Sequence, residues 1–115
     1  MKSQQLRKLA PELDSLRLGS GWSVEDLQKP QIIVESSYGH SHPGSAHLQA
    51  LVEEAGKGIK DCGGKAANYY VTDICDGEAQ GHDGMNYSLV SRDIMAAMIE
   101  IHVKPTPSDA GVFIT

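Results

Sequence analysis

The sequence predicts an α/β protein, a three-layer fragment of a parallel sheet in the order strand, helix, strand, helix, strand. Three observations predict this class. Short β-branched or apolar runs alternate with longer stretches in which apolar residues recur at helical spacing. That alternation favours parallel strands joined by right-handed crossovers. The last apolar run ends at Thr115, and parallel strands need cover on both faces, so we expect part of a larger domain.

Residues 1–30 are predicted to form an N-terminal arm, and residues 31–115 the partial α/β domain. The arm is polar and holds few residues that could bury a face of their own. Proline and glycine interrupt it at four places: Pro11, Gly19, Gly21 and Pro30. A short helix is expected over 4–9, and a second turn follows Ser23, whose hydroxyl can cap it. We therefore expect the arm to lie against another part of the protein.

The first strand and the first long helix follow the arm. The β-branched run at 31–35 is typical of a buried strand, and a polar turn at 36–42 comes after it. Pro43 stands where a helix can begin. Apolar residues then recur at helical spacing: Leu48, Leu51, Val52, Ala55 and Ile59. The pattern predicts an amphipathic helix that ends at Gly63 and Gly64.

The second half of the domain repeats this order. Residues 67–72 are predicted to form a strand, 73–86 a long glycine-bearing loop, and 112–115 a third strand. Between the loop and the last strand, five apolar residues share one helical face: Val90, Ile94, Ala97, Met98 and Ile101. Pro105 and Pro107 end this second amphipathic helix.

The composition is that of one globular domain. Of the 115 residues, 40% are hydrophobic and 22% are charged, which fits neither a disordered tail nor a membrane protein. The net charge of −5 lacks the positive excess that a nucleic-acid partner requires. No apolar run is long enough for a signal peptide or a bilayer span. The cytoplasm is the expected location, with both cysteines free or bound to metal.

Two long polar loops, 36–47 and 73–88, leave predicted strands at their carboxyl ends, where open α/β sheets bind ligands. Three aspartates of the second loop offer oxygen ligands that suit Mg²⁺: Asp73, Asp76 and Asp83. Cys75 adds a soft ligand of the type that iron–sulfur clusters use. In the competing interpretation, aspartate and glycine serve turn geometry and Cys75 is a small buried side chain. Spacing alone favours this competing interpretation.

Other ligand patterns are not met. Three histidines lack the spacing of a zinc site and are expected to face solvent or substrate: His40, His42 and His47. Three glycines of the second loop match neither the Walker nor the dinucleotide pattern: Gly77, Gly81 and Gly84. Met95 and Met98 are interpreted as helix core rather than as cofactor ligands. Cys62, at the predicted end of the first helix, is interpreted as structural.

Three strings of the sequence carry a resemblance to a known family. They read PGSAHL at 43–48, CDGEAQGHDGM at 75–85 and NYSLVSRD at 86–93. Together they resemble the dihydroxy-acid and sugar-acid dehydratase family, which includes 6-phosphogluconate dehydratase. The pattern is most similar to the xylonate dehydratase branch. The resemblance covers the chain from about Trp22 onward.

The resemblance implies a hydro-lyase that removes water from a 2,3-dihydroxy acid and yields a 2-keto-3-deoxy acid. In the family an iron–sulfur cluster, [2Fe–2S] or [4Fe–4S], acts as a Lewis acid on the departing 3-hydroxyl, while Mg²⁺ holds the carboxylate and the 2-hydroxyl. Asp76 matches the family's magnesium aspartate. Substrate-binding residues are expected in both loops: His40, Ser41, His42, His82 and Asp83.

The chain departs from the family pattern in two respects. Gly44 stands where many members have a cluster cysteine, so we expect Cys75 to supply a thiolate instead. Family members are several times longer, and their remaining cluster and magnesium ligands and their serine base follow the segment that matches this chain. The resemblance therefore implies an N-terminal part that is inactive alone, from an enzyme that is expected to be a homo-oligomer.

Three functions fit these observations. The first is the N-terminal portion of a hydro-lyase that acts on a small-molecule sugar acid such as D-xylonate. The histidine-rich loop at 40–47 favours such a substrate, because several neutral donors and acceptors can meet several hydroxyls. The second is a stand-alone module that binds a divalent cation, or mediates assembly, without catalysis. The third keeps the family and has a branched-chain dihydroxy acid as substrate.

Overall fold

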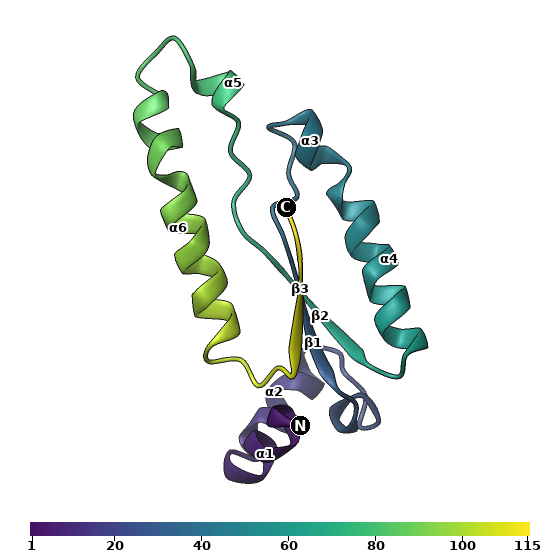
Figure 1. The fold of residues 1–115 in the computed structure, drawn as a ribbon. Coiled ribbons are helices and arrows are strands. Elements are labelled where there is room, and N and C mark those ends of the chain that lie inside the picture. Colours follow the sequence, from purple (N-terminus) through teal and green to yellow (C-terminus); the bar gives the residue numbers. More distant parts are fainter.

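The strands of the protein form one parallel sheet, which a computed structural model of residues 1–115 places between two long helices (Figure 1). The strands are β1 (Gln31–Ser36), β2 (Lys65–Tyr70) and β3 (Ala110–Ile114), in the spatial order β2-β1-β3. Both strand pairs are parallel. The α/β class, the parallel sheet and the alternation of strands and helices are therefore confirmed.

The helices lie on opposite faces of the sheet. Between β1 and β2 the chain forms α3 (Pro43–Ala46) and α4 (Leu48–Asp61), and between β2 and β3 it forms α5 (Asp76–Ala79) and α6 (Met85–Val103). The first connection runs from the central strand β1 to β2, and the second runs back from β2 across β1 to β3, so crossovers of the same hand must pass over opposite faces. Figure 1 shows α4 and α6 on the two sides of the sheet. The strand order therefore reverses between β1 and β3, and their carboxyl ends form the expected ligand-binding edge.

Helix α4 is the well-packed layer. Leu48 and Val52 are buried against the sheet, where Ile33 and Val34 of β1 are also buried. The helix ends as predicted at the glycine pair. The residue after its last turn, Gly63, has φ of +81°, and the following amide donates to the carbonyl of Ile59 at 2.8 Å.

Helix α6 packs differently from the expectation. Its predicted apolar face points to solvent, with Val90, Ile94 and Ile101 all at least half exposed. The buried residues of this helix are Ser88 and Ser91. The periodicity specifies which residues share a face, but it does not specify which face meets the sheet. Burial of the face that carries Val90, Ile94 and Ile101 is therefore wrong as a prediction. Met95 and Met98, the expected core residues, are half-buried, which agrees in part with that interpretation.

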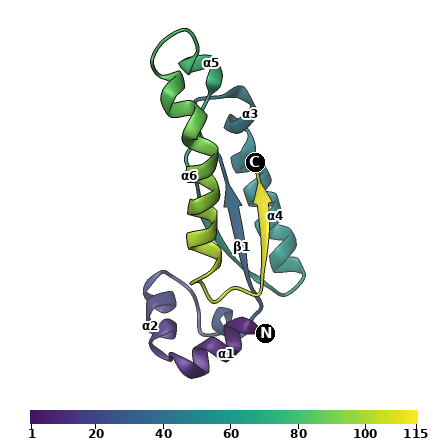
Figure 2. The same ribbon diagram turned by 60° about the vertical axis from the view of Figure 1, so that its left-hand side comes forward.

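The N-terminal arm covers the amino end of the sheet. It consists of α1 (Lys2–Leu9), α2 (Glu12–Gly19) and the 3₁₀ turn η1 (Asp26–Gln28). Figure 2 shows α1 and α2 beneath the sheet, at the end opposite to α3 and α5. Helix α2 was not predicted. The cap at Ser23 is present, since its Oγ accepts from the amide of Asp26 at 3.1 Å.

Two strands begin earlier than predicted. Strand β2 begins at Lys65 rather than at 67, and β3 begins at Ala110 rather than at 112. The pairing with β1 explains both shifts, because Lys65 lies opposite Gln31 and Ala110 lies opposite Ile32. Lysine, alanine and glycine are weak strand formers, so local propensity does not reveal these first residues.

None of the helices combines the length and the apolar character that crossing a bilayer would require.

Candidate functional site

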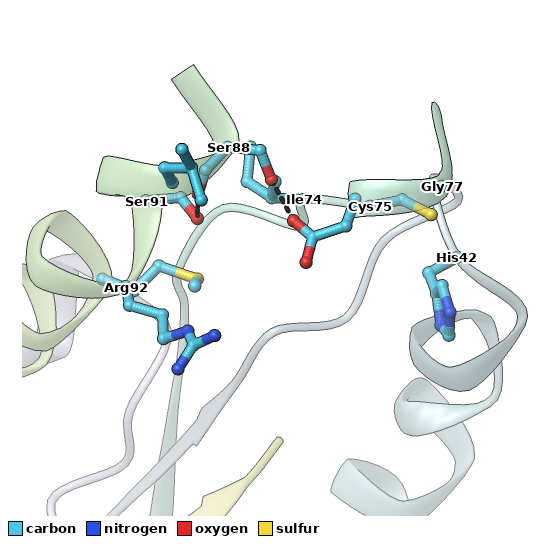
Figure 3. A pocket seen from close by; sticks show the side chains of 10 residues that line it. His42, Ile74, Cys75, Gly77, Ser88, Ser91 and Arg92 are labelled. Carbon is cyan, nitrogen blue, oxygen red and sulfur yellow. Dashed lines mark hydrogen bonds between the residues drawn. The ribbon is translucent and has the colours of Figure 1, made fainter. Parts of the chain in front are cut away.

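A polar cavity of about 320 Å³ opens at the carboxyl end of the sheet. The loop after β2, the start of α5 and the first turns of α6 form its walls, and His42 approaches from the loop after β1 (Figure 3). Its polar and ionisable lining side chains are His42, Cys75, Asp76, Ser88, Ser91 and Arg92. The cavity therefore joins both loops that the sequence singled out.

Asp76 lies at the wall of this cavity. It is the first residue of α5, and one of its carboxylate oxygens accepts a hydrogen bond from the hydroxyl of Ser88 on α6, the dashed line in Figure 3. Ser88 is buried, and its own carbonyl accepts from the hydroxyl of Ser91 at 2.6 Å. The second oxygen of Asp76 has no hydrogen-bond partner in the chain. The carboxylate is thus held from one side by a side chain and is open on the other.

The two cysteines lie at opposite ends of the sheet. Cys75 is half-buried in the wall of the Asp76 cavity, whereas Cys62 is exposed at the end of α4 beside Pro30 and Ile32. Iron–sulfur clusters are commonly held by four thiolates. The chain has no group of three or more His, Cys, Asp or Glu side chains arranged to hold a metal ion. Its own residues therefore do not fit a complete cluster, and Cys75 offers at most one ligand.

Asp73 connects the two polar loops instead of facing the cavity with free oxygens. Its carboxylate accepts from the amide of Ser41 at 2.7 Å and from the hydroxyl of Ser45 at 2.7 Å. A Cβ added to Gly39 would overlap the Asp73 side chain, so the backbone must approach closely at this point. Asp73, one of three aspartates that the sequence offered to Mg²⁺, here serves to position the loop.

His42 and His40, from the loop after β1, have different surroundings. His42 lines the Asp76 cavity, and its Nδ1 accepts from the amide of Gly44 at 2.8 Å. In the neutral ring the proton therefore resides on Nε2. His40 is exposed and hydrogen-bonds through Nε2 to the hydroxyl of Tyr38 at 3.1 Å. Of these two predicted substrate ligands, only His42 is in the cavity.

The other predicted substrate residues lie beside the cavity. Ser41 and His82 line a neighbouring hollow of about 210 Å³, which Cys75 also borders. His82 uses both ring nitrogens: Nδ1 accepts from the amide of Gly84 at 3.0 Å, and Nε2 donates to the carbonyl of Glu78 at 2.8 Å. It thereby fastens the turn between α5 and α6. Asp83 is exposed on that turn.

Three residues of the cavity were not identified from the sequence. Ser88, Ser91 and Arg92 lie on one face of α6 because they are three or four residues apart. A polar stripe at this spacing, opposite the apolar stripe of the same helix, was the available signal. Its meaning was hidden because an exposed polar face is the ordinary expectation for an amphipathic helix.

Comparison with known proteins gives one consistent result. A family model described as "Dihydroxy-acid/6-phosphogluconate dehydratase N-terminal" matches residues 29–115. The chain is 40% identical over 96 residues to a dihydroxy-acid dehydratase of Ignicoccus hospitalis, which covers 84% of this chain and 17% of that protein. It is 38% identical over 100 residues to a dihydroxy-acid dehydratase of Methanosarcina barkeri, covering 87% and 18% respectively.

A dihydroxy-acid dehydratase of Desulfitobacterium hafniense is similar at 40% identity over 100 residues, again covering 87% of this chain and 18% of that protein. The chain thus spans less than a fifth of the length of the curated relatives it matches. The xylonate branch stays a prediction.

Proposed function

The chain belongs to the dihydroxy-acid/6-phosphogluconate dehydratase family, and on this premise we propose that it forms the magnesium-binding wall of a hydro-lyase active site. The reaction removes water from a 2,3-dihydroxy acid, and the resulting enol becomes a 2-keto acid. The observation that carries the proposal is the Asp76 carboxylate. It lies in a polar cavity with one oxygen held by Ser88 and the other without a partner.

The residues present fit Mg²⁺ in part. Mg²⁺ binds one or two carboxylates and keeps several waters, so a single aspartate is an adequate protein contribution from this wall. A bound Mg²⁺ stabilises the negative charge that develops when the proton beside the substrate carboxylate leaves. Asp76 would hold the ion, and Ser88 fixes the direction of its carboxylate through the hydroxyl hydrogen bond. The remaining oxygen ligands would come from water, substrate and other parts of the native polypeptide.

Cys75 is proposed as a single thiolate ligand rather than as a cluster site. It borders the cavity next to Asp76, and Gly44 cannot supply a ligand atom from its side chain. Replacing Cys75 with serine in the native polypeptide should lower the iron content and the visible absorption of the cluster. Unchanged iron content and absorption would remove Cys75 from the ligand set.

A branched-chain 2,3-dihydroxy acid is the substrate class that the named relatives support. All three relatives described above carry the name dihydroxy-acid dehydratase. A sugar acid is the second candidate, and the presence of His42 in the cavity wall favours it, because the ring offers a hydrogen-bond donor to a further hydroxyl. Rates of keto-acid formation from a branched-chain dihydroxy acid and from D-xylonate separate the two.

The test of the function is substitution of Asp76 in the native polypeptide. Asp76→Asn keeps the shape of the side chain but removes the charge that binds Mg²⁺. Charge stabilisation by a metal contributes several kcal/mol, so keto-acid formation should fall by about a hundredfold or more. Asp93→Asn is the matched control, since Asp93 is an exposed carboxylate on α6 outside the cavity. Equal rates for Asp76→Asn and the native protein would refute the proposal.

The stand-alone cation-binding or assembly module is the remaining alternative. It requires the 115-residue chain to bind Mg²⁺ tightly by itself, yet the chain brings no three ligating side chains together. Calorimetric titration of the chain with MgCl₂ distinguishes this module from the proposed dehydratase wall. A folded monomer with micromolar affinity, and no dehydratase activity in the native polypeptide, would favour the module.

A further inference from the structure

Arg92 occupies the same cavity as Asp76 and comes from a different wall. It lies one helical turn after Ser88 on α6, and so it shares the face that Ser88 presents to the cavity. Figure 3 shows its guanidinium pointing into the open space that separates α6 from His42. Among the residues that line the cavity, Arg92 is the only one with a permanent positive charge.

The Arg92 guanidinium has no partner within the chain, and this distinguishes it from the other arginines. Arg7 makes two hydrogen bonds to Asp14, at 2.5 and 2.7 Å, and Arg17 lies 4.4 Å from the ring centroid of Trp22. Arg92 forms no hydrogen bond or ion pair, even with Asp76 in the same cavity. Arg92 is exposed, so water rather than a protein group meets its five donors, and all of them are available to a ligand that enters the cavity.

We propose that Arg92 binds the carboxylate of the substrate together with the proposed Mg²⁺, which the family resemblance also assigns to that carboxylate. The role rests on the proposed dehydratase function and specifies how its cavity selects acids. The planar guanidinium matches a carboxylate in a two-bond geometry that lysine cannot reproduce. The charges of the cavity are divided accordingly. The Asp76 carboxylate is oriented by the hydrogen bond from Ser88 and would bind the cation. The Arg92 guanidinium has no partner in the chain and would bind the anion.

The decisive experiment varies both Arg92 and the substrate carboxylate in the native polypeptide. Arg92→Gln removes the positive charge. Arg92→Lys keeps the charge but removes the planar guanidinium that can donate two parallel hydrogen bonds. A charge-assisted pair of hydrogen bonds corresponds to a change of about tenfold to hundredfold. KM for the dihydroxy acid should therefore rise by about that factor in Arg92→Gln, and by less in Arg92→Lys. KM for the corresponding primary amide should not change.

The matched control is Lys60→Gln, which removes an exposed cation of α4 far from the cavity lining and should leave both values of KM unchanged. An equal change for acid and amide would show that Arg92 acts on the structure alone and would overturn the proposal. Unchanged KM for the acid in both Arg92 variants would overturn it as well.

A binding measurement separates this proposal from the function on which it rests. Glycolate carries a carboxylate and a 2-hydroxyl but no 3-hydroxyl, so it cannot lose water, and glycolamide lacks only the charge. In calorimetry the native polypeptide should bind glycolate about tenfold or more tightly than Arg92→Gln does, and should bind glycolamide equally. Arg92-dependent glycolate binding without dehydratase activity would refute the function and support the anion site. Dehydratase activity together with glycolate binding that does not depend on Arg92 would support the proposed function and refute the anion site.

Discussion

The two ends of the sheet treat their charged groups in opposite ways. At the amino end, Asp109 accepts from the amide and hydroxyl of Ser3 and from the amide of Gln31, at 3.0, 2.6 and 2.9 Å. At the carboxyl end, Asp76 keeps one oxygen without a partner, and Arg92 has no partner at all. The Asp109 carboxylate at the amino end is fully engaged, although the buried side-chain oxygen of Gln31 beside it has no hydrogen-bond partner.

This difference separates structural from functional charges. Buried polar groups are almost always hydrogen-bonded, because leaving one without a partner costs free energy. Asp76 and Arg92 are exposed, so water can meet their polar atoms at no such cost, and both charges stay available to a ligand in the cavity. Position at the carboxyl end does not by itself leave a carboxylate without partners. Asp73 lies at that end, and both of its oxygens accept hydrogen bonds, from Ser41 and Ser45. Its neighbour Asp76, three residues later, is the open one.

The strongest test of this contrast is Asp109→Ala. The substitution leaves the amide and hydroxyl of Ser3, a residue with no exposed surface, and the amide of Gln31 without their acceptor. The free energy of unfolding should fall by about 3 kcal/mol, as measured by urea denaturation. Asp76→Ala is the matched variant at the carboxyl end; it removes the acceptor of only one buried donor, the Ser88 hydroxyl, and should cost about 1 kcal/mol. Equal losses of unfolding free energy in Asp109→Ala and Asp76→Ala would show that the two ends of the sheet do not differ in this way.

A second test addresses the one engaged aspartate at the carboxyl end. Gly39→Ala introduces a methyl group where the Asp73 side chain already lies, so the loop that Asp73 holds must move. Overpacking of this kind costs about 2 kcal/mol. Gly56→Ala, in open space within α4, is the control and should be neutral or stabilising by up to about 1 kcal/mol. A free energy of unfolding equal to that of the native chain in Gly39→Ala would show that the contact between the loops does not contribute to stability.

The third and smallest effect depends on pH. Hydrogen bonds from Lys29, then from Lys65 and from the Ser23 amide, hold the pKa of Asp26 well below its ordinary value. Asp26→Asn should lower the free energy of unfolding by about 1 kcal/mol at neutral pH, because its carboxylate is 14% exposed and meets two lysines.

The sign of the pH dependence follows from the depressed pKa of Asp26 in the folded protein. The ionised form stabilises the fold, so the contribution is complete above the ordinary carboxyl pKa of about 4 and is lost as the pH falls through the folded value. Urea titrations of the native chain and Asp26→Asn should therefore converge in acid. A constant difference between the two from pH 7 to pH 2 would contradict the assignment.

Asp109 should contribute to the same acid sensitivity. Burial raises the pKa of Asp109, but hydrogen bonds from the Ser3 hydroxyl and from the amides of Gln31 and Ser3 outweigh burial and leave it below its ordinary value. Acid should accordingly loosen the amino end of the sheet.

Much of the fold could be predicted from the sequence because it depends on neighbours along the chain. The periodicity of Leu48 and Val52 predicted α4, and the glycine pair at 63 and 64 predicted its end. The strings around Asp76 predicted the family and placed that aspartate at a strand's carboxyl end. The helix and its end need only local geometry, whereas the family rests on the resemblance of these strings to known members.

The orientation of α6 could not be predicted in this way. The helix has an apolar stripe and a polar stripe, and a free helix would bury the apolar one. Here the less exposed face is mixed, with buried serines in the first turns and the half-buried Met95 and Met98 after them. His102 on this face hydrogen-bonds to the buried Glu35 of β1 at 2.6 Å, and Ser88 holds Asp76. The residues of the first pair are 67 positions apart, so no window of sequence contains both.

The sequence by itself determined the strands and long helices in their order, the family resemblance and the presence of a carboxylate loop at the ligand-binding edge, but not helix α2. Only the tertiary structure decided which of the loop's aspartates is engaged, which histidine enters the cavity and that Arg92 lines the same cavity as Asp76. The reason is physical. Periodicity and turn chemistry act over a few residues, whereas whether a charge finds a partner depends on segments that meet only after the sheet has formed.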